Sequence, residues 1–145
     1  MGKVDQRFVD FIHEHHVMTL ATCVNNMPWV ANCFYTYDAE ENIFIVTTDT
    51  KTKHGTQAIE NSCVALSIVL ETEKVGMIQG LQVSAKMECI EASMFSKYRL
   101  KYLKRFPYAV LKQSDLWIIS PKQMKFTDNR LGFGKKLIWE TEVLL

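Results

Sequence analysis

Apolar residues recur along this chain first at helical spacing and then in short alternating runs. Helical spacing relates Val4, Phe8, Phe11 and Ile12, and predicts an amphipathic helix over residues 4–15 that packs against the rest of the fold. Alternation and short apolar runs predict strands at residues 17–24, 28–37, 43–48, 63–70, 81–89, 116–120, 123–127 and 136–140.

Polar connections between these runs predict how the strands are joined. Residues 25–27 form a turn of hairpin length, and residues 40–42 lead into the next strand, so we expect an antiparallel meander. A short helix near residues 55–61 and a longer one over residues 93–106, ended by Pro107, complete the pattern. Short strands separated by turns favour a small barrel in one domain spanning residues 1–145.

Composition and charge narrow the class of protein. The chain has 145 residues, is 48% hydrophobic and carries a net charge of +1. This balance argues against nucleic acid as a partner, because such proteins present a strongly basic face. The N-terminus lacks the apolar run of a signal peptide, and no stretch approaches the ~18–20 apolar residues of a membrane span, so we expect a cytoplasmic protein without membrane contact.

The cysteine and histidine positions do not have the spacing of a metal site. The four cysteines are widely spaced within apolar segments, so we interpret them as small buried hydrophobic residues. His13, His15 and His16 lie at the end of the first predicted helix, where protonated histidines favour the helix dipole. The zinc-protease pattern would need a histidine at Val17, and we therefore predict no metal.

Threonine and lysine residues gather where the strand at 43–48 meets the short helix. The cluster comprises Thr47, Thr48, Thr50, Lys51, Thr52, Lys53 and His54. Basic residues are unfavourable at the positive end of a helix, so a bound phosphate would explain them. An N-capping threonine in a solvated, lysine-bearing turn explains the same residues without a ligand.

Other motifs offer no catalytic group. No serine, histidine and aspartate set, paired carboxylates or nucleotide-binding glycine loop can be assembled, and Gly132-Phe133-Gly134 precedes a strand and predicts a turn. Basic residues concentrate on the helix at 93–106, which is typical of a solvated face, although a surface for an acidic partner would have the same composition.

The order of these features resembles the FMN-binding split β-barrel superfamily related to pyridoxamine 5'-phosphate oxidase. The resemblance runs through residues 27–38, the strand at 43–48, Lys51-Thr52-Lys53, an N-x-x-V-x-L pattern at 61–66 and the strand at 79–85. Residues 128–134 look like those of a bacterial branch of that superfamily. The resemblance implies a mainly β fold with peripheral helices, a six-stranded antiparallel split β-barrel of the FMN-binding type.

The resemblance also implies which residues hold the cofactor, with phosphate on the loop and the isoalloxazine ring along the strand at 28–37. Phosphate would bind Thr47, Thr48, Lys51, Thr52 and Lys53, and the ring would contact the backbone of Ala31, Asn32 and Cys33. Gln79, Gln82 and Trp117 would add side contacts, and Asn129 and Arg130 would reach the cofactor of a partner subunit in a homodimer.

Departures from the oxidase pattern bear on the reaction. An arginine near Val30 and a lysine near Tyr35 are missing, and the terminal R-L-H-x-R motif is replaced by residues 130–134, so we do not expect pyridoxamine phosphate oxidation. The resemblance implies an FMN-dependent oxidoreductase with a small-molecule electron donor or acceptor and no identified catalytic residue. The alternative is a non-enzymatic binding or sensing protein that holds flavin, haem or deazaflavin.

Overall fold

The computed structural model describes residues 2–90, 92–111 and 114–141, and its backbone is dominated by one antiparallel sheet. The elements in chain order are α1 (Gln6–Glu14), β1 (Val17–Val24), β2 (Met27–Phe34), β3 (Thr36–Asp38), β4 (Ile43–Thr47), α2 (Lys53–Glu60), β5 (Cys63–Val69), η1 (Val75–Met77), β6 (Gln79–Cys89), α3 (Ala92–Arg105), η2 (Pro107–Leu111), β7 (Leu116–Asp128), η3 (Asn129–Leu131) and β8 (Lys136–Glu140).

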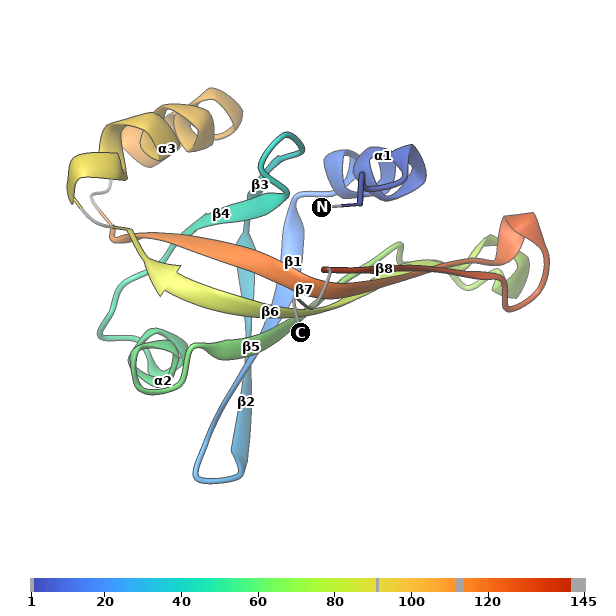
Figure 1. The fold of residues 1–145 in the computed structure, drawn as a ribbon, viewed down its shortest axis with the longest axis horizontal. Helices are drawn as coiled ribbons and strands as arrows, with labels where there is room; N and C mark the ends of the chain where they lie inside the picture. The colour runs from blue at the N-terminus through green and yellow to red at the C-terminus, as the bar shows by residue number, and fades with distance from the viewer. Residues whose placement is uncertain (1, 91, 112–113, 142–145) are drawn as a thin grey trace.

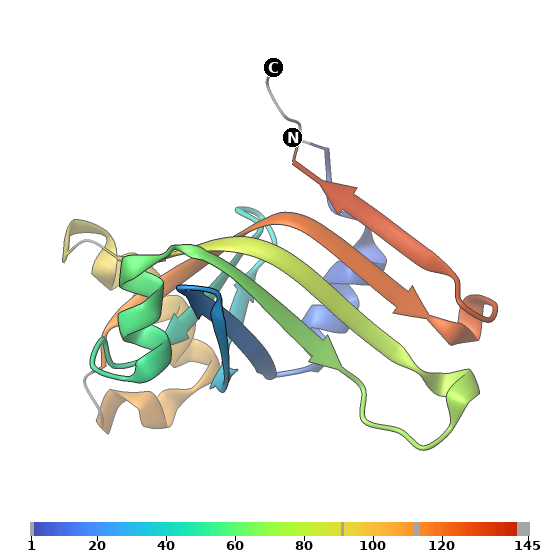
Figure 2. The same cartoon turned by 90° about the horizontal axis from the view of Figure 1, so that it is seen from below.

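The sheet curls into a half-barrel, as expected for a mainly β split barrel with peripheral helices (Figures 1 and 2). Its strand order is β2-β1-β5-β6-β7-β4-β3, with β8 paired to β7. The described part of the chain has eight strands, which is the number that the apolar pattern predicted and two more than the resemblance implied. The strand boundaries differ from the pattern at two places, Tyr35 and Pro121.

The segment expected as one strand over residues 28–37 is divided into β2 and β3. Tyr35 separates them: its N–H donates to the His16 carbonyl at 3.0 Å, and its buried hydroxyl donates to the Ile12 carbonyl at 2.6 Å. These bonds fix the side chain beneath α1 while the backbone turns from β1 toward β4. Tyr35 therefore ends the edge strand and begins the closure of the barrel.

The two strands expected at 116–120 and 123–127 form one continuous β7. Pro121 lies opposite Ala85 and Gln123 lies opposite Ser84, so Lys122 is an extra residue where the register shifts. Proline is tolerated in a strand at such a bulge, since the ladder is already interrupted there. Both expected segments are therefore strand, but they are joined by the bulge and do not end at it.

Helix α1 covers the core from the side of the sheet that carries the large apolar side chains. Asp5 caps α1 by accepting from the Arg7 N–H at 2.9 Å, and Phe8 and Phe11 pack on Phe126 with ring centroids 5.7 and 4.9 Å apart. The first helix was expected to pack in this way. The buried face of α1 covers the inner side of β7.

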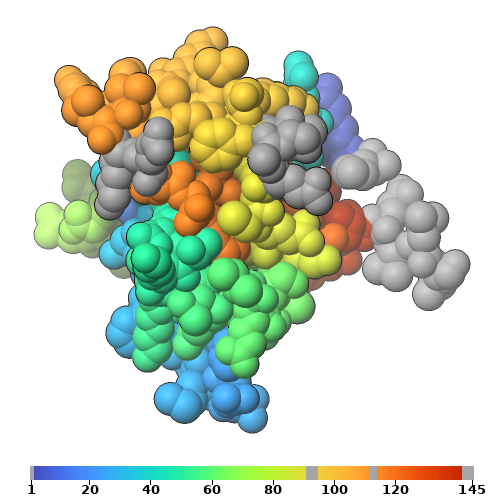
Figure 3. Space-filling view, turned by 90° about the vertical axis from the view of Figure 1, so that its left-hand side faces the viewer, coloured from blue at the N-terminus to red at the C-terminus, as the bar shows by residue number. Residues whose placement is uncertain are grey.

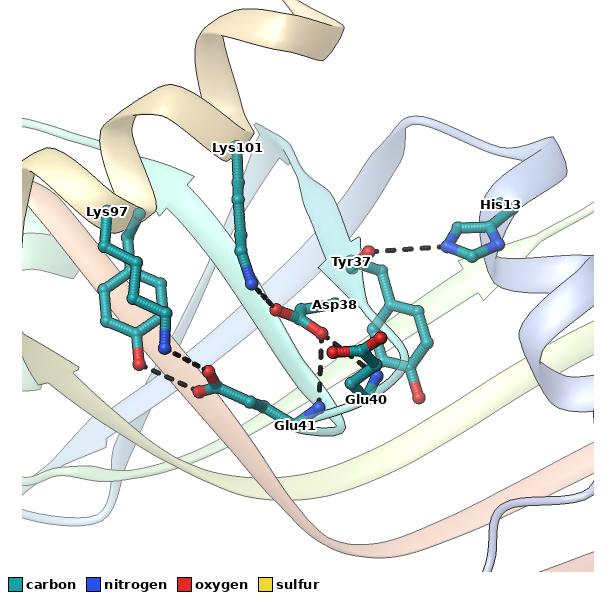
Figure 4. Close-up of polar contacts among 8 residues, drawn as sticks. His13, Tyr37, Asp38, Glu40, Glu41, Lys97 and Lys101 are labelled. Atoms are coloured by element: carbon teal, nitrogen blue, oxygen red, sulfur yellow. Dashed lines mark hydrogen bonds and ion pairs between the residues drawn. The ribbon is translucent and has the colours of Figure 1, made fainter.

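Helix α3 is held on β3 and β4 by apolar and ionic contacts. Tyr98 and Tyr102 pack against Ile43 and Ile45, and Figure 4 shows the polar contacts that join the helix to the β3–β4 turn. The Lys101 ammonium pairs with the buried Asp38, while Lys97 and the Tyr98 hydroxyl bind Glu41. Arg105 donates to the carbonyls of Tyr35, His13 and His15. Part of the basic charge on this helix is therefore used within the molecule.

Candidate cofactor site

The loop between β4 and α2 is an ordered turn built around the N-cap of α2. The Thr52 hydroxyl accepts from the Gly55 N–H at 3.1 Å and donates to the Asp49 carbonyl at 2.7 Å. The Asp49 carboxylate accepts from the Lys51 N–H at 2.8 Å, and the Thr50 N–H donates to Asp115 at 3.2 Å. Thr52 thus has the N-cap role that the sequence left open.

The start of α2 still offers donors and positive charge beyond this cap. The bonds of the helix begin with the N–H groups of Gly55 and Thr56, so among the described residues the N–H groups of Lys53 and His54 have no protein acceptor. The side chains of Lys51 and Lys53 are exposed, and acidic residues are absent from the first turn. This arrangement suits an anion better than a neutral group.

Adjacent threonines at the end of β4 face opposite sides of the strand. Thr48 is buried, and its hydroxyl lies 2.6 Å from Nε2 of His54, whereas Thr47 lies beside Tyr102 of α3. Burial lowers the pKa of His54 below its usual value of 6.5. His54 is therefore neutral at pH 7, so that the positive charge of the loop comes from its lysines.

Two tryptophans flank the same loop. Trp117 is buried and its Nε1 donates to the Thr48 carbonyl at 3.1 Å, so this residue holds the loop from the side of the core. The Trp29 ring on β2 lies 4.1 Å from Nζ of Lys53. Trp29 was not among the predicted site residues, because the contact depends on how α2 docks beside the hairpin; Figure 3 shows the face on which α2 and the hairpin both lie.

Strand β2 carries the backbone expected to contact a flavin ring. Among the strands that the structure describes it is the last on its side of the sheet, so none of them uses one row of its N–H and C=O groups. Asn32 is exposed, Ala31 is half-buried and Cys33 is buried. Burial raises the pKa of the Cys33 thiol to about 11. The structure places this edge next to α2 through the Trp29 contact.

The remaining expected contacts lie at the opposite end of the sheet. Arg130 donates to the Asp128 carboxylate at 2.9 Å and to Oε1 of Gln79 at 3.0 Å, and its guanidinium lowers the pKa of Asp128. Asn129 donates to the Val75 carbonyl at 2.8 Å. Within one chain, these residues are not brought together with the loop before α2.

The outer face of the sheet is open, and we call it the open face. It is hollowed by a cavity of about 420 Å³. Gln82 lies in this hollow, whose lining residues are Thr19, Ala21, Val30, Ala65, Leu66, Ser67, Gln82, Val83, Ser84, Gln123, Lys125 and Ile138. Small and apolar side chains predominate, and Val30 and Ile138 are 61% and 57% exposed.

The cysteines correct one expectation. Cys33 is buried as predicted, but Cys63 and Cys89 are exposed and Cys23 is half-buried. The apolar runs that contain Cys63 and Cys89 belong to strands with one buried and one open side. A cysteine in such a run can face either side, and alternation alone does not identify the solvent side.

Comparison with known proteins agrees with the fold and places the chain in a family. The architecture is that of the split-barrel proteins related to pyridoxamine 5'-phosphate oxidase. The chain belongs to the pyridoxamine 5'-phosphate oxidase family, whose model matches residues 4–128. It is 38% identical to a UPF0306 protein of Cronobacter sakazakii in an alignment of 129 residues. That alignment covers 89% of this chain and 90% of the other protein.

Solved structures extend the likeness at low sequence identity. A haem-binding protein from Mycobacterium smegmatis superposes with a TM-score of 0.75 at 14% identity, covering 90% of this chain and 55% of that one. An FAD-binding protein from Mesorhizobium loti superposes with a TM-score of 0.70 at 11% identity, covering 83% of this chain and 91% of that one. In the described part of the chain, no helix is long and apolar enough to cross a membrane.

Proposed function

We propose that the protein is an FMN-binding oxidoreductase in which the loop before α2 holds the phosphate of the cofactor. The main support for the proposal is the start of α2, where the N–H groups of Lys53 and His54 have no acceptor within the described part of the chain and two lysine side chains lie within three residues. A phosphate group supplies the negative charge and the acceptors that this helix end lacks.

The residues of the loop fit such a phosphate in distinct ways. Lys51 and Lys53 supply charge, whereas Thr52 orders the turn as the N-cap. His54 is neutral and is held by Thr48, so it positions the loop without adding charge. The Asp49 carboxylate already accepts a hydrogen bond from the Lys51 N–H, so part of the negative charge of Asp49 is compensated within the turn.

The edge of β2 is the proposed support for the isoalloxazine ring. Ala31, Asn32 and Cys33 lie on the strand whose Trp29 contacts Lys53, so the phosphate loop and this edge are adjacent. Bound FMN would carry hydride or electrons, and the protein would bind the ring, orient it and exclude water. The substrate would be a small-molecule electron donor or acceptor.

A second copy of the chain is the proposed cover for the open face. The hollow is lined largely by small and apolar side chains, and exposed Val30 and Ile138 are typical of a surface that a partner buries. In a homodimer, Asn129 and Arg130 would approach the cofactor of the other subunit. This would account for their distance from the loop in their own chain.

A haem protein is the second candidate, because the structural neighbours include a haem-binding protein and a haem storage protein. FMN is favoured because the loop before α2 offers donors and positive charge for a phosphate, and Nε2 of its histidine, His54, is already bonded to Thr48. A non-enzymatic flavin-binding protein would have the same site and would differ in failing to turn over electron donors.

Titration with FMN and with riboflavin, followed by flavin fluorescence, tests the phosphate site. We expect Lys53→Ala to weaken FMN binding by about 1–3 kcal/mol, because a charge-assisted contact is lost, and to leave riboflavin binding unchanged. Lys122→Ala replaces an exposed lysine on β7 and serves as the control. Equal affinities for FMN and riboflavin in the natural protein would contradict the proposal.

A further inference from the structure

Two of the cysteines lie opposite each other on neighbouring strands. The ladder between β1 and β5 pairs Thr19 with Ser67, Leu20 with Leu66 and Ala21 with Ala65. Continuing this antiparallel register by two residues places Cys23 opposite Cys63. The alternation of side chains puts both thiols on the same side as Ala21 and Ala65, which line the open face.

Burial supports this placement of the two thiols. The residues beside them in sequence, Thr22 and Val64, are 2% and 7% exposed and point inward. Cys63 is exposed and Cys23 is half-buried, and both are free thiols. Neither cysteine is among the residues that line the hollow, so the pair lies outside the part of the open face that we expect a second copy to cover. It is reachable from solvent there, with Cys63 the more accessible member.

One side chain connects the backbones of the two cysteines. Nδ2 of Asn61 donates to the Cys23 carbonyl at 2.9 Å, and Oδ1 of Asn61 accepts from the Cys63 N–H at 3.1 Å. The last ladder pair between β1 and β5 is Ala21 with Ala65, so no ladder bond fixes the strands at the cysteines. Beyond Ala21 and Ala65 the Asn61 amide joins the two backbones in place of a ladder bond. A disulfide spans Cα atoms about 4.4–6.8 Å apart, so its closure requires the strands to approach each other at this end. The open end of the ladder allows the small movement that closure needs.

We propose that Cys23 and Cys63 form a dithiol site that a small-molecule disulfide converts to an intramolecular disulfide. The Cys63 thiolate attacks one sulfur of oxidised glutathione, forming a mixed disulfide and releasing one glutathione thiolate. The Cys23 thiolate then attacks the Cys63 sulfur and releases the second glutathione. The two protein thiols are oxidised, the glutathione disulfide is reduced to two thiols, and the two protons pass to the released thiolates.

The other exposed cysteine provides an internal comparison. Cys89 lies opposite Trp117 on β7, so no thiol faces it across that pair of strands. Burial and the nearby Asp115 raise the pKa of the Cys89 thiol, which reduces its thiolate fraction at neutral pH. Cys89 can accept a glutathionyl group but cannot resolve it.

The test is treatment of the folded natural protein with oxidised glutathione, followed by digestion without reductant and mass spectrometry. We expect a cross-linked pair of peptides that contains Cys23 and Cys63 and lacks glutathione. Cys23→Ser should lose the cross-link and retain a glutathionyl group on Cys63. Cys63→Ser should lose both, and Cys89→Ser should form the cross-link as the natural protein does.

Two results would overturn the inference. One is a stable glutathionyl group on Cys63 of the natural protein, which would mean that Cys23 cannot reach it. The other is the absence of both cross-link and adduct under conditions in which a circular dichroism spectrum shows the protein to be folded. The reaction does not need FMN, so failure of the flavin proposal leaves this test unaffected.

Discussion

Thr48 and Thr52 illustrate how similar side chains in one loop have separate roles. Thr52 caps α2 and ties the turn to Asp49, while Thr48 is buried and binds His54. Trp117 donates to the carbonyl of Thr48 from beneath. The hydroxyls therefore order the loop, and the charge available to a ligand comes from Lys51 and Lys53.

The half-buried, neutral His54 should make the free energy of unfolding depend on pH. Because burial lowers its pKa in the folded protein, the unfolded chain binds a proton near pH 6.5 that the folded chain resists. The free energy of unfolding should thus decrease as pH falls through 6.5, and it should recover as pH rises. We expect His54→Gln, which retains a polar group beside Thr48, to remove part of this decrease.

Urea unfolding at a series of pH values between 5 and 8 measures the effect of His54→Gln. The variant keeps the other histidines, so the difference between the two pH profiles isolates His54. Profiles that run parallel through this range would show that His54 titrates alike in the folded and unfolded chains.

At the scale of elements, the attachment of α3 to the β3–β4 turn depends on one buried carboxylate. Asp38 is 8% exposed, accepts from the N–H groups of Glu40 and Glu41 and pairs with Lys101. Burial alone would raise the pKa of Asp38, but the Lys101 ammonium and the backbone donors outweigh it and lower the pKa below 3.8. The charged pair should therefore stabilise the fold above about pH 4 and lose this effect as pH falls further.

Asp38→Asn tests the attachment of α3, since asparagine retains an oxygen for the backbone donors and removes the charge facing Lys101. We expect the free energy of unfolding at pH 7 to fall by about 1–3 kcal/mol and the dependence on acid to become weaker. Lys97→Met changes the more exposed ion pair on the same helix and should have a smaller effect. Equal losses for the two variants, measured by urea unfolding, would argue against the special role of Asp38.

The sequence was sufficient for most elements because local signals and tertiary packing agree there. The hairpin of β1 and β2 and the final strand β8 lie where alternation and turn residues place them. The continuous β7 was missed because a proline usually ends a strand, whereas the bulge opposite Ser84 and Ala85 accommodates Pro121. The extent of β7 thus depended on its partner strand β6 as much as on the sequence of β7 itself.

The candidate site was predictable only in part. Sequence order identified the lysines and threonines of the loop, but it did not identify Trp29, whose contact with Lys53 requires α2 to dock beside β2. The solvent side of each strand was also not predictable from alternation, so the exposure of Cys63 and its register with Cys23 depended on the fold.

At the scale of the whole molecule, the open face is the surface through which we expect two copies to associate. A double substitution, Val30→Glu with Ile138→Glu, places charge at two exposed apolar positions that line the hollow. We expect the natural protein to sediment as a dimer and this variant as a monomer with weakened FMN binding, because burying unpaired charge is costly.

The matched control for this double variant is Leu100→Glu, which changes an equally apolar residue, 70% exposed, on α3. It should remain a dimer in analytical ultracentrifugation. A natural protein that is monomeric at concentrations where FMN is bound would contradict the shared site, and dissociation of the Leu100→Glu variant would place the contact elsewhere.

The most direct test of the flavin site is the visible absorption spectrum of the protein after desalting, before and after addition of FMN. We predict flavin bands near ~370 and ~450 nm that remain with the protein after a second desalting step, since the phosphate of FMN would be held by the loop before α2. A colourless protein that fails to retain added FMN, or a Soret band with no flavin bands, would contradict the account.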